Sequence, residues 1–160
     1  ENVNSGRNNM PQPTGPLIAD CSTWLSIVSK LFNTRMGVLL TPHGLTPAQF
    51  SILHHVTRPR LDGDHSISSI ARSVEVEQPA VTKTIAKFQN LGLVQIAVHP
   101  TDKRAKLVKT TPEAHKLLGV IYQDIGPDLY TVFNSLDGTD IESFAGQLKT
   151  LGTWLDKNRL

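Results

Sequence analysis

The segment 77–91 combines two kinds of residue at helical spacing. Apolar residues recur every three or four positions at Val81, Ile85, Phe88 and Leu91, with polar or small residues between them. A glutamine amide can bind adenine in a bidentate manner, threonine can donate or accept a hydrogen bond, and lysine can reach guanine or a phosphate. We therefore predict an amphipathic helix whose outer face contacts duplex DNA. Its contact residues would be Gln78, Pro79, Ala80, Thr82, Lys83 and Lys87.

A second set of charged residues follows at 102–106. The apolar and polar alternation of 94–99 is typical of a half-buried strand, and 106–109 is the predicted return strand. The tip of this hairpin carries Asp102, Lys103 and Arg104, with Lys106 next to it. We expect Arg104 to contact a phosphate or the minor groove, and Asp102 to orient its guanidinium. An ordinary charged turn is the alternative.

The segments before residue 77 would position both the contact residues of the 77–91 helix and the charged residues of the hairpin. Ser66 is suited to cap a short helix that ends at Val74, and Glu75 and Val76 leave only a tight connection to the helix at 77–91. Helix, tight turn, helix and hairpin is the order of a winged helix-turn-helix, in which a helix about 10–12 Å across enters a major groove about 12 Å wide. The alternative to DNA contact is that the outer face of the 77–91 helix is the solvent-exposed side of a core helix.

We predict a mainly α fold with a small β-hairpin wing. Residues 1–16 have no periodicity and are predicted to be a mobile tail, and 17–44 form an N-terminal dimerisation helix. Residues 45–111 form the winged helix-turn-helix lobe, whose first helix opens with Thr46, Pro47 and Gln49. Residues 112–160 form C-terminal dimerisation helices, and Asp137 is expected to cap the last of them.

The outer helices carry wide apolar stripes, which include Trp24, Phe144, Leu151 and Leu155. A chain of 160 residues has little core to cover both stripes, so we expect a homodimer that buries them across a two-fold axis. Two copies of the 77–91 helix would then lie about one DNA turn apart, roughly 34 Å.

Charge is unevenly distributed although the net charge is only +2. Residues 72–109 contain seven basic and three acidic residues, and residues 110–160 contain four basic and seven acidic residues. A basic middle suits a polyanion. The single cysteine, the lack of a signal-peptide pattern and the lack of a membrane-length apolar run predict a cytoplasmic protein with no membrane partner.

The stretch 45–112 resembles the MarR family of bacterial regulators. The matching pieces are Leu-Thr-Pro-Ala-Gln-Phe (45–50), Ile-Ser-Ser-Ile-Ala (67–71), Val-Thr-Lys-Thr-Ile (81–85), Leu-Gly-Leu-Val (91–94), Asp-Lys-Arg-Ala-Lys-Leu-Val (102–108) and Thr-Thr-Pro (110–112). The resemblance implies a homodimer on a palindromic operator, commonly a repressor, with Asp102 and Arg104 in the wing signature. Glu77 departs from the small cap residue that such proteins often have at this position.

The resemblance also implies a small aromatic or phenolic effector in a cleft beside the DNA-binding lobe. Candidate lining residues are Trp24, Val28, Arg35, Phe50 and His54. Plain core positions are the alternative for Trp24 and Phe50. A redox role is one interpretation of Cys21, but its place on the apolar stripe favours the alternative of a buried, unreactive thiol. No pair of histidines has the i, i+4 spacing of helical zinc ligands, and we expect no metal and no cofactor.

Two other function classes compete with that of a DNA-binding regulator. We find no GxGxxG, P-loop, GxSxG or HExxH motif, so we do not expect an enzyme. A winged-helix protein-interaction module without DNA binding is the alternative function. Such a module should lack exposed basic residues at positions such as Lys83, Lys87, Lys103 and Arg104.

Overall fold

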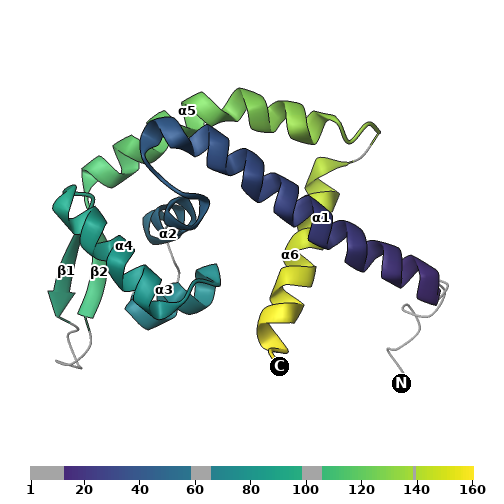
Figure 1. Ribbon diagram of the computed structural model, residues 1–160, viewed down its shortest axis with the longest axis horizontal. Coiled ribbons are helices and arrows are strands. Elements are labelled where there is room, and N and C mark those ends of the chain that lie inside the picture. The colour runs from purple at the N-terminus through teal and green to yellow at the C-terminus, as the bar shows by residue number, and fades with distance from the viewer. Residues whose placement is uncertain (1–12, 59–65, 99–105, 139) are drawn as a thin grey trace, which may run out of the picture. The chain divides into compact units, whose positions relative to one another are not determined.

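The computed structural model describes residues 13–58, 66–98, 106–138 and 140–160. The chain divides within its second helix into two compact units, Glu1–Phe50 and Ser51–Leu160. In these residues the elements are α1 Gly15–Leu40, η1 Thr41–His43, α2 Pro47–Thr57, α3 Ile67–Val74, α4 Gln78–Asn90, β1 Val94–Val98, β2 Lys106–Thr110, α5 Pro112–Asn134 and α6 Ile141–Lys157 (Figure 1). The predicted fold class, mainly α with one hairpin, is confirmed.

The first unit consists mainly of α1. This helix begins at Gly15, so the last two residues of the predicted 1–16 tail are helical, because Pro16 takes one of the first helical positions where its missing N–H costs nothing. It ends at Leu40 rather than continuing to 44, and Gly44 closes the following 3-10 turn with a φ of 67°. Met36 and Leu40 are its only buried residues among those described.

Helix α2 starts as predicted. The backbone N–H of Gln49 donates to Oγ1 of Thr46, and the N–H of Thr46 donates to Oε1 of Gln49, both at 3.2 Å. This reciprocal pair is a capping box, which satisfies two N–H groups that the helix itself cannot bond. Leu53 and Val56 are buried as expected, whereas Phe50 is half-buried.

The core of the second unit joins α2, α3, α4, the hairpin and α5. Helix α4 packs against α3 and β1, and α3 also contacts β2. The strands are antiparallel, with Val94 opposite Thr110 and Val98 opposite Lys106, and the Oγ1 of Thr111 donates to the carbonyl of Gly92 at 2.7 Å. The largest fully buried side chains of this core are Ile52, Leu53, Ile70, Phe88, Val81, Val94, Val108, Ile121 and Ile125.

The turn before α6 corrects one prediction. Asp137 does not cap the last helix; the carboxylate of Asp140 accepts the N–H of Glu142 at 3.0 Å instead. Gly138 has a φ of 66°, a left-handed conformation that does not continue into a helix, and α6 begins only at Ile141. None of the described helices combines the length and apolar character that crossing a bilayer requires.

Candidate nucleic-acid interface

Helix α4 has a buried side and an exposed side, as its residue pattern predicts. Val81, Ile85 and Phe88 are buried, with Phe88 and Val81 fully so. Leu91 was expected to pack inward, but it is 57% exposed, because α4 ends at Asn90 and Gly92 redirects the chain with a φ of 71°. The structure brings five predicted contact residues together on the exposed side, and Lys87 is half-buried on the same helix. The five are Gln78, Pro79, Ala80, Thr82 and Lys83.

The first turn of α4 has consequences for recognition. Glu77 is the N-cap residue, yet its side chain makes no capping hydrogen bond. The N-terminal end of α4 is therefore not satisfied by its own cap, and such an end favours anions. The hydroxyl of Thr82 donates to the carbonyl of Gln78 at 2.9 Å, so this hydroxyl has its lone pairs left for an incoming donor.

Helix α3 and the following turn hold α4 in place. The N–H of Ser69 donates to Oγ of Ser66 at 3.2 Å, which confirms Ser66 as the cap. Ile70 is fully buried, and α3 ends at Val74 where Glu75 adopts the left-handed conformation with a φ of 53°. The N–H of Val76 still donates to the carbonyl of Ala71, at 3.2 Å. The predicted tight connection is thus a hydrogen-bonded turn.

The hairpin, which contacts α4 through β1, carries two exposed lysines on β2. Lys106 opens β2, and Lys109, near its other end, lies opposite Gln95. Lys109, which was not among the predicted contact residues, is exposed because it lies on the face of β2 opposite to the buried Val108. The predicted tip residues Asp102, Lys103 and Arg104 lie outside the described residues.

The predicted effector residues fall in two different units. Trp24 and Val28 are 61% and 55% exposed on α1, Arg35 is exposed, and Phe50 is half-buried; these four belong to the first unit. His54 belongs to the second unit. A pocket formed by all five therefore stays a prediction.

His54 has a partner that sequence reasoning missed. The hydroxyl of Tyr122 on α5 and Nδ1 of His54 are hydrogen-bonded at 2.6 Å, and the two rings meet edge to face with centroids 5.9 Å apart. Burial and the charge of Arg58 lower the pKa of His54 below its ordinary value of 6.5, and burial raises the pKa of Tyr122. The contact spans 68 residues of sequence, so no local signal indicates it.

Cys21 departs from expectation. We predicted a buried thiol, but Cys21 is exposed, because the apolar stripe on which it lies is itself exposed and only Met36 and Leu40 of α1 are buried. Among the residues that the structure describes, no group of three or more histidine, cysteine or acidic side chains is arranged to hold a metal ion.

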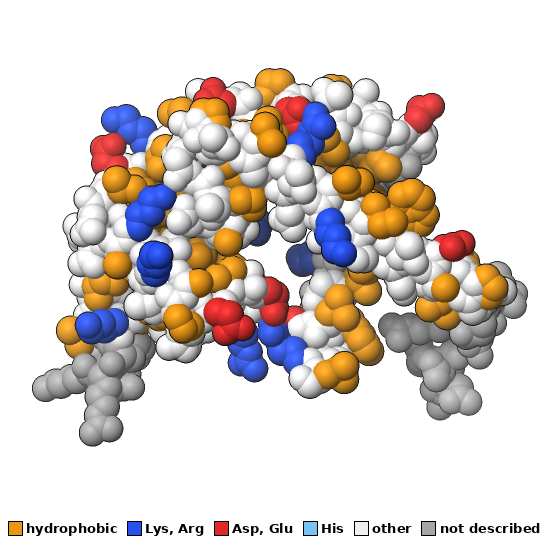
Figure 2. Space-filling model, viewed as in Figure 1, with side chains coloured by type: hydrophobic (Ala, Val, Ile, Leu, Met, Phe, Trp, Pro, Cys, Tyr) orange, Lys and Arg blue, Asp and Glu red, His pale blue; other side chains and the backbone are white. Residues whose placement is uncertain are grey.

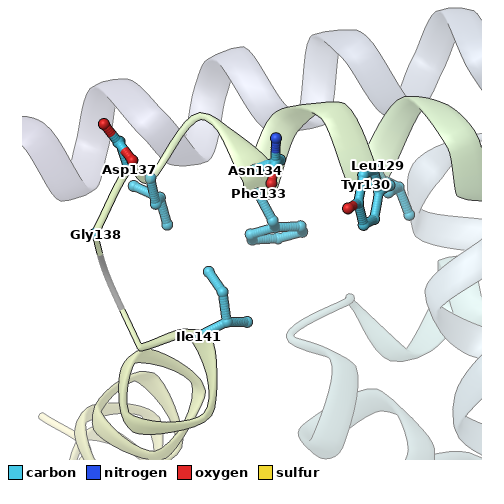
Figure 3. Close-up of a pocket in the computed structure, with 8 residues that line it drawn as sticks. Leu129, Tyr130, Phe133, Asn134, Asp137, Gly138 and Ile141 are labelled. Carbon is cyan, nitrogen blue, oxygen red and sulfur yellow. The ribbon is translucent and has the colours of Figure 1, made fainter.

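A shallow hollow of about 520 Å³ lies where α5 turns into α6 (Figure 3). Tyr130 and Phe133 come from the last turns of α5, and Ile141 comes from the first turn of α6. Tyr130 is 73% exposed. Sequence reasoning did not predict this apolar hollow, because it depends on the angle of the turn.

Comparison with known proteins supports the same interpretation of the fold. The family described as winged helix DNA-binding domain matches residues 45–114, which run from two residues before α2 to the first turn of α5. This range contains the whole of α3, the turn, α4 and the hairpin.

Solved structures match over most of the chain. A MarR-family transcriptional regulator from Rhodococcus sp. RHA1 has a TM-score of 0.72 at 18% identity, covering 86% of this chain and 96% of its own. CouR from Rhodococcus jostii RHA1, bound to p-coumaroyl-CoA, has a TM-score of 0.71 at 17% identity, covering 92% and 99%. The S. aureus MepR–DNA complex has a TM-score of 0.66 at 19% identity, covering 84% and 97%. Residues 45–114 are thus similar to the winged helix DNA-binding domain family, and the chain has the fold of the MarR-family transcriptional regulators.

Proposed function

We propose that this protein is a transcriptional regulator that binds a palindromic operator as a homodimer and acts as a ligand-responsive repressor. One observation carries the proposal: α4 buries its apolar side and exposes Gln78, Thr82 and Lys83, beside a hairpin with exposed lysines. A helix of this kind fits a major groove and presents side chains that bond base edges and phosphates.

The exposed residues divide into two roles. Gln78, with Pro79 and Ala80, lies at the N-terminal end of α4, the end that enters the groove in helix-turn-helix proteins, so we assign it base recognition. Lys83, Lys106 and Lys109 are assigned to phosphates, which set register and most of the salt dependence. Lys103 and Arg104 are proposed to extend the phosphate contacts at the wing tip, and Asp102 is proposed to orient the guanidinium of Arg104.

The test is selection of binding sites from random duplexes, followed by affinity measurements at several salt concentrations. We expect a palindrome with half-sites about one turn apart and a steep fall in affinity with salt. Arg104→Ala should weaken binding strongly without unfolding the protein. A wild-type protein that binds no duplex at low salt would refute the proposal and favour the protein-interaction module.

The proposed dimer explains an exposed apolar face on α1. Its residues recur at helical spacing on one side and are 45% to 64% exposed in the single chain. An exposed apolar face of this length on a protein marks an interaction surface. The face consists of Leu17, Ile18, Trp24, Leu25, Val28 and Leu31.

Helix α6 presents a second such face in the other unit. No residue of α6 is buried, and hydrophobic side chains gather along it (Figure 2). The apolar hollow at the turn between α5 and α6 continues this surface through Ile141. The exposed apolar residues of α6 are Ile141, Leu148, Leu151, Trp154 and Leu155. Two-fold pairing of identical chains would cover such faces in both copies.

The dimer is tested by light scattering after size exclusion. We expect two chains per particle in the wild type and one in Leu151→Asp, because a buried carboxylate without a partner opposes association. Thr153→Asp is the matched control, since Thr153 lies on the opposite side of α6 from Leu151 and should leave the dimer intact. A monomeric wild type at micromolar concentration would refute the homodimer.

A small aromatic or phenolic effector is proposed to bind near Trp24, Val28, Arg35, Phe50 and His54. The support is that these residues offer aromatic surface, a cation and a hydrogen-bonding imidazole, and that a protein of the same fold was solved with p-coumaroyl-CoA. p-Coumarate is a suitable probe: we expect it to quench tryptophan fluorescence and release DNA. Quenching that persists unchanged in Trp24→Phe would refute this location.

A further inference from the structure

Arg159 ties the end of α6 to the turn between α3 and α4. Its guanidinium donates to a carboxylate oxygen of Glu75, and Nη2 also donates to the backbone carbonyl of Arg72 at 3.1 Å. The same guanidinium donates to Oδ1 of Asp156, from Nε at 3.0 Å and from Nη2 at 2.6 Å. One side chain thus joins α6 to both the side chain and the backbone of the helix-turn-helix turn.

The backbone conformation of Glu75 indicates that its contact with Arg159 has a role. Among the described residues, Glu75 is the only residue other than glycine with a positive φ. Glycine and asparagine adopt this left-handed conformation most readily, whereas a glutamate is disfavoured there. A residue held in a disfavoured conformation at a turn suggests a role for its side chain, and here the carboxylate accepts from Arg159.

The turn sets the direction of α4. Only Val76 and Glu77 separate Glu75 from Gln78, the first residue of α4. A shift of the turn therefore moves the N-terminal end of α4, where the base-reading residues are proposed to lie. The C-terminal end is held separately, because Phe88 is fully buried.

The contact can open without disturbing the core. The side chains of Arg159, Glu75 and Asp156 are 35%, 71% and 62% exposed. They border a hollow of about 880 Å³, which Arg58 and Lys149 also line. Ion pairs this exposed contribute little to stability and weaken with salt. Orientation of the turn is therefore a better account of the contact than stabilisation of the fold.

We propose that Arg159 is a positioning residue for the DNA-reading helix: by binding Glu75 and the carbonyl of Arg72, it fixes the turn so that Gln78 meets the base edges. The inference rests on the proposed DNA-binding function. The hydrogen bonds from Arg159 to Glu75 and Asp156 raise the pKa of Arg159, and the Arg159 guanidinium lowers the pKa of Asp156.

The test compares Arg159→Ala, Glu75→Gln and the double variant on the selected duplex and on a random duplex. Each single variant should lose about twofold to fivefold in affinity per half-site of the selected duplex, the range expected for one exposed ion pair. Random duplex should lose less, because phosphate contacts tolerate a tilted helix. The double variant should lose no more than Arg159→Ala. Arg159→Lys, which keeps the charge without the planar fork, should recover only part of the loss.

Lys157→Ala is the matched control, since it removes one positive charge from the same end of α6. Amide exchange of residues 75–78 gives a second readout that needs no DNA: exchange should be faster in Arg159→Ala than in Lys157→Ala. Equal exchange in these two variants, or losses that add in the double variant, would overturn the positioning role. A wild type that binds no DNA would instead count against the proposed function.

Discussion

Replacing Lys83 with alanine tests the interface of α4 most directly. Lys83 is exposed on the outer side of a helix whose inner side is fully buried at Val81 and Phe88, so the substitution removes a charge without touching the core. Alanine is at least as good a helix former as lysine, so the thermal midpoint should not fall. Circular dichroism checks this before any DNA measurement.

The magnitude follows from counterion release. One phosphate contact contributes about 0.9 to the slope of log affinity against log salt, so two copies in a homodimer contribute about 1.8. Between about 50 and 200 mM salt, wild-type affinity should therefore fall about 12-fold more than that of Lys83→Ala. Fluorescence anisotropy with a labelled duplex at four salt concentrations measures both slopes.

A control variant and the size of the change in salt slope show whether Lys83 contacts a phosphate. Lys116→Ala removes the same charge from α5, where the side chain is 75% exposed and pairs with Glu113 at 3.8 Å, and should leave the slope unchanged. Equal slopes for Lys83→Ala and Lys116→Ala would refute the phosphate assignment. A change of about 0.9 would indicate one contact per complex and contradict the two-fold arrangement. An unchanged slope with relaxed preference at one base pair would assign Lys83 to guanine instead.

Three further variants test other parts of the structure. Gln78→Ala should lower the affinity for the selected duplex by about 10-fold or more and should change the affinity for a random duplex little. Equal losses of affinity on both duplexes would exclude base recognition by Gln78. Phe88→Ala removes a fully buried ring and should lower the free energy of unfolding by about 3–5 kcal/mol in urea titrations, and a loss below about 1 kcal/mol would contradict this core. Because the pKa of His54 is lowered in the folded protein, the unfolded chain binds more protons below pH 6.5. The free energy of unfolding should therefore have its full value above pH 6.5 and decline as the pH falls through the pKa of His54 in the folded protein. His54→Asn should flatten that decline, and an unchanged pH profile would show that His54 is not responsible.

Features set by neighbouring residues could be predicted from the sequence. The capping box of Thr46 and Gln49 and the cap at Ser66 need only residues three apart, and all of them form as expected. The two faces of α4 follow from helical periodicity, which is a local property as well. These features are enough to place the candidate interface on one helix and one hairpin.

Features that depend on chain direction or distant packing could not be predicted. Asp137 and Asp140 are both plausible caps, and the left-handed conformation of Gly138, which the sequence does not fix, places the cap at Asp140. The pairs His54 with Tyr122 and Arg159 with Glu75 span 68 and 84 residues, so no window of sequence contains both members. Local patterns therefore identify the two faces of α4 but not the long-range contacts that join α2 to α5 and the end of the chain to the turn before α4.

The exposed faces of α1 and α6 show a further limit of periodicity. An apolar stripe predicts that a helix face will be covered, but it does not say whether the same chain or another copy supplies the cover. In this chain the stripe of α4 is covered by its own unit, whereas Trp24 of α1 and Trp154 of α6 remain about 60% exposed. Because leaving many large apolar side chains in water is unfavourable, the uncovered stripes favour a second copy as the missing partner. The spacing of the two reading helices, and hence of the operator half-sites, would then be set by helices that make no contact with DNA.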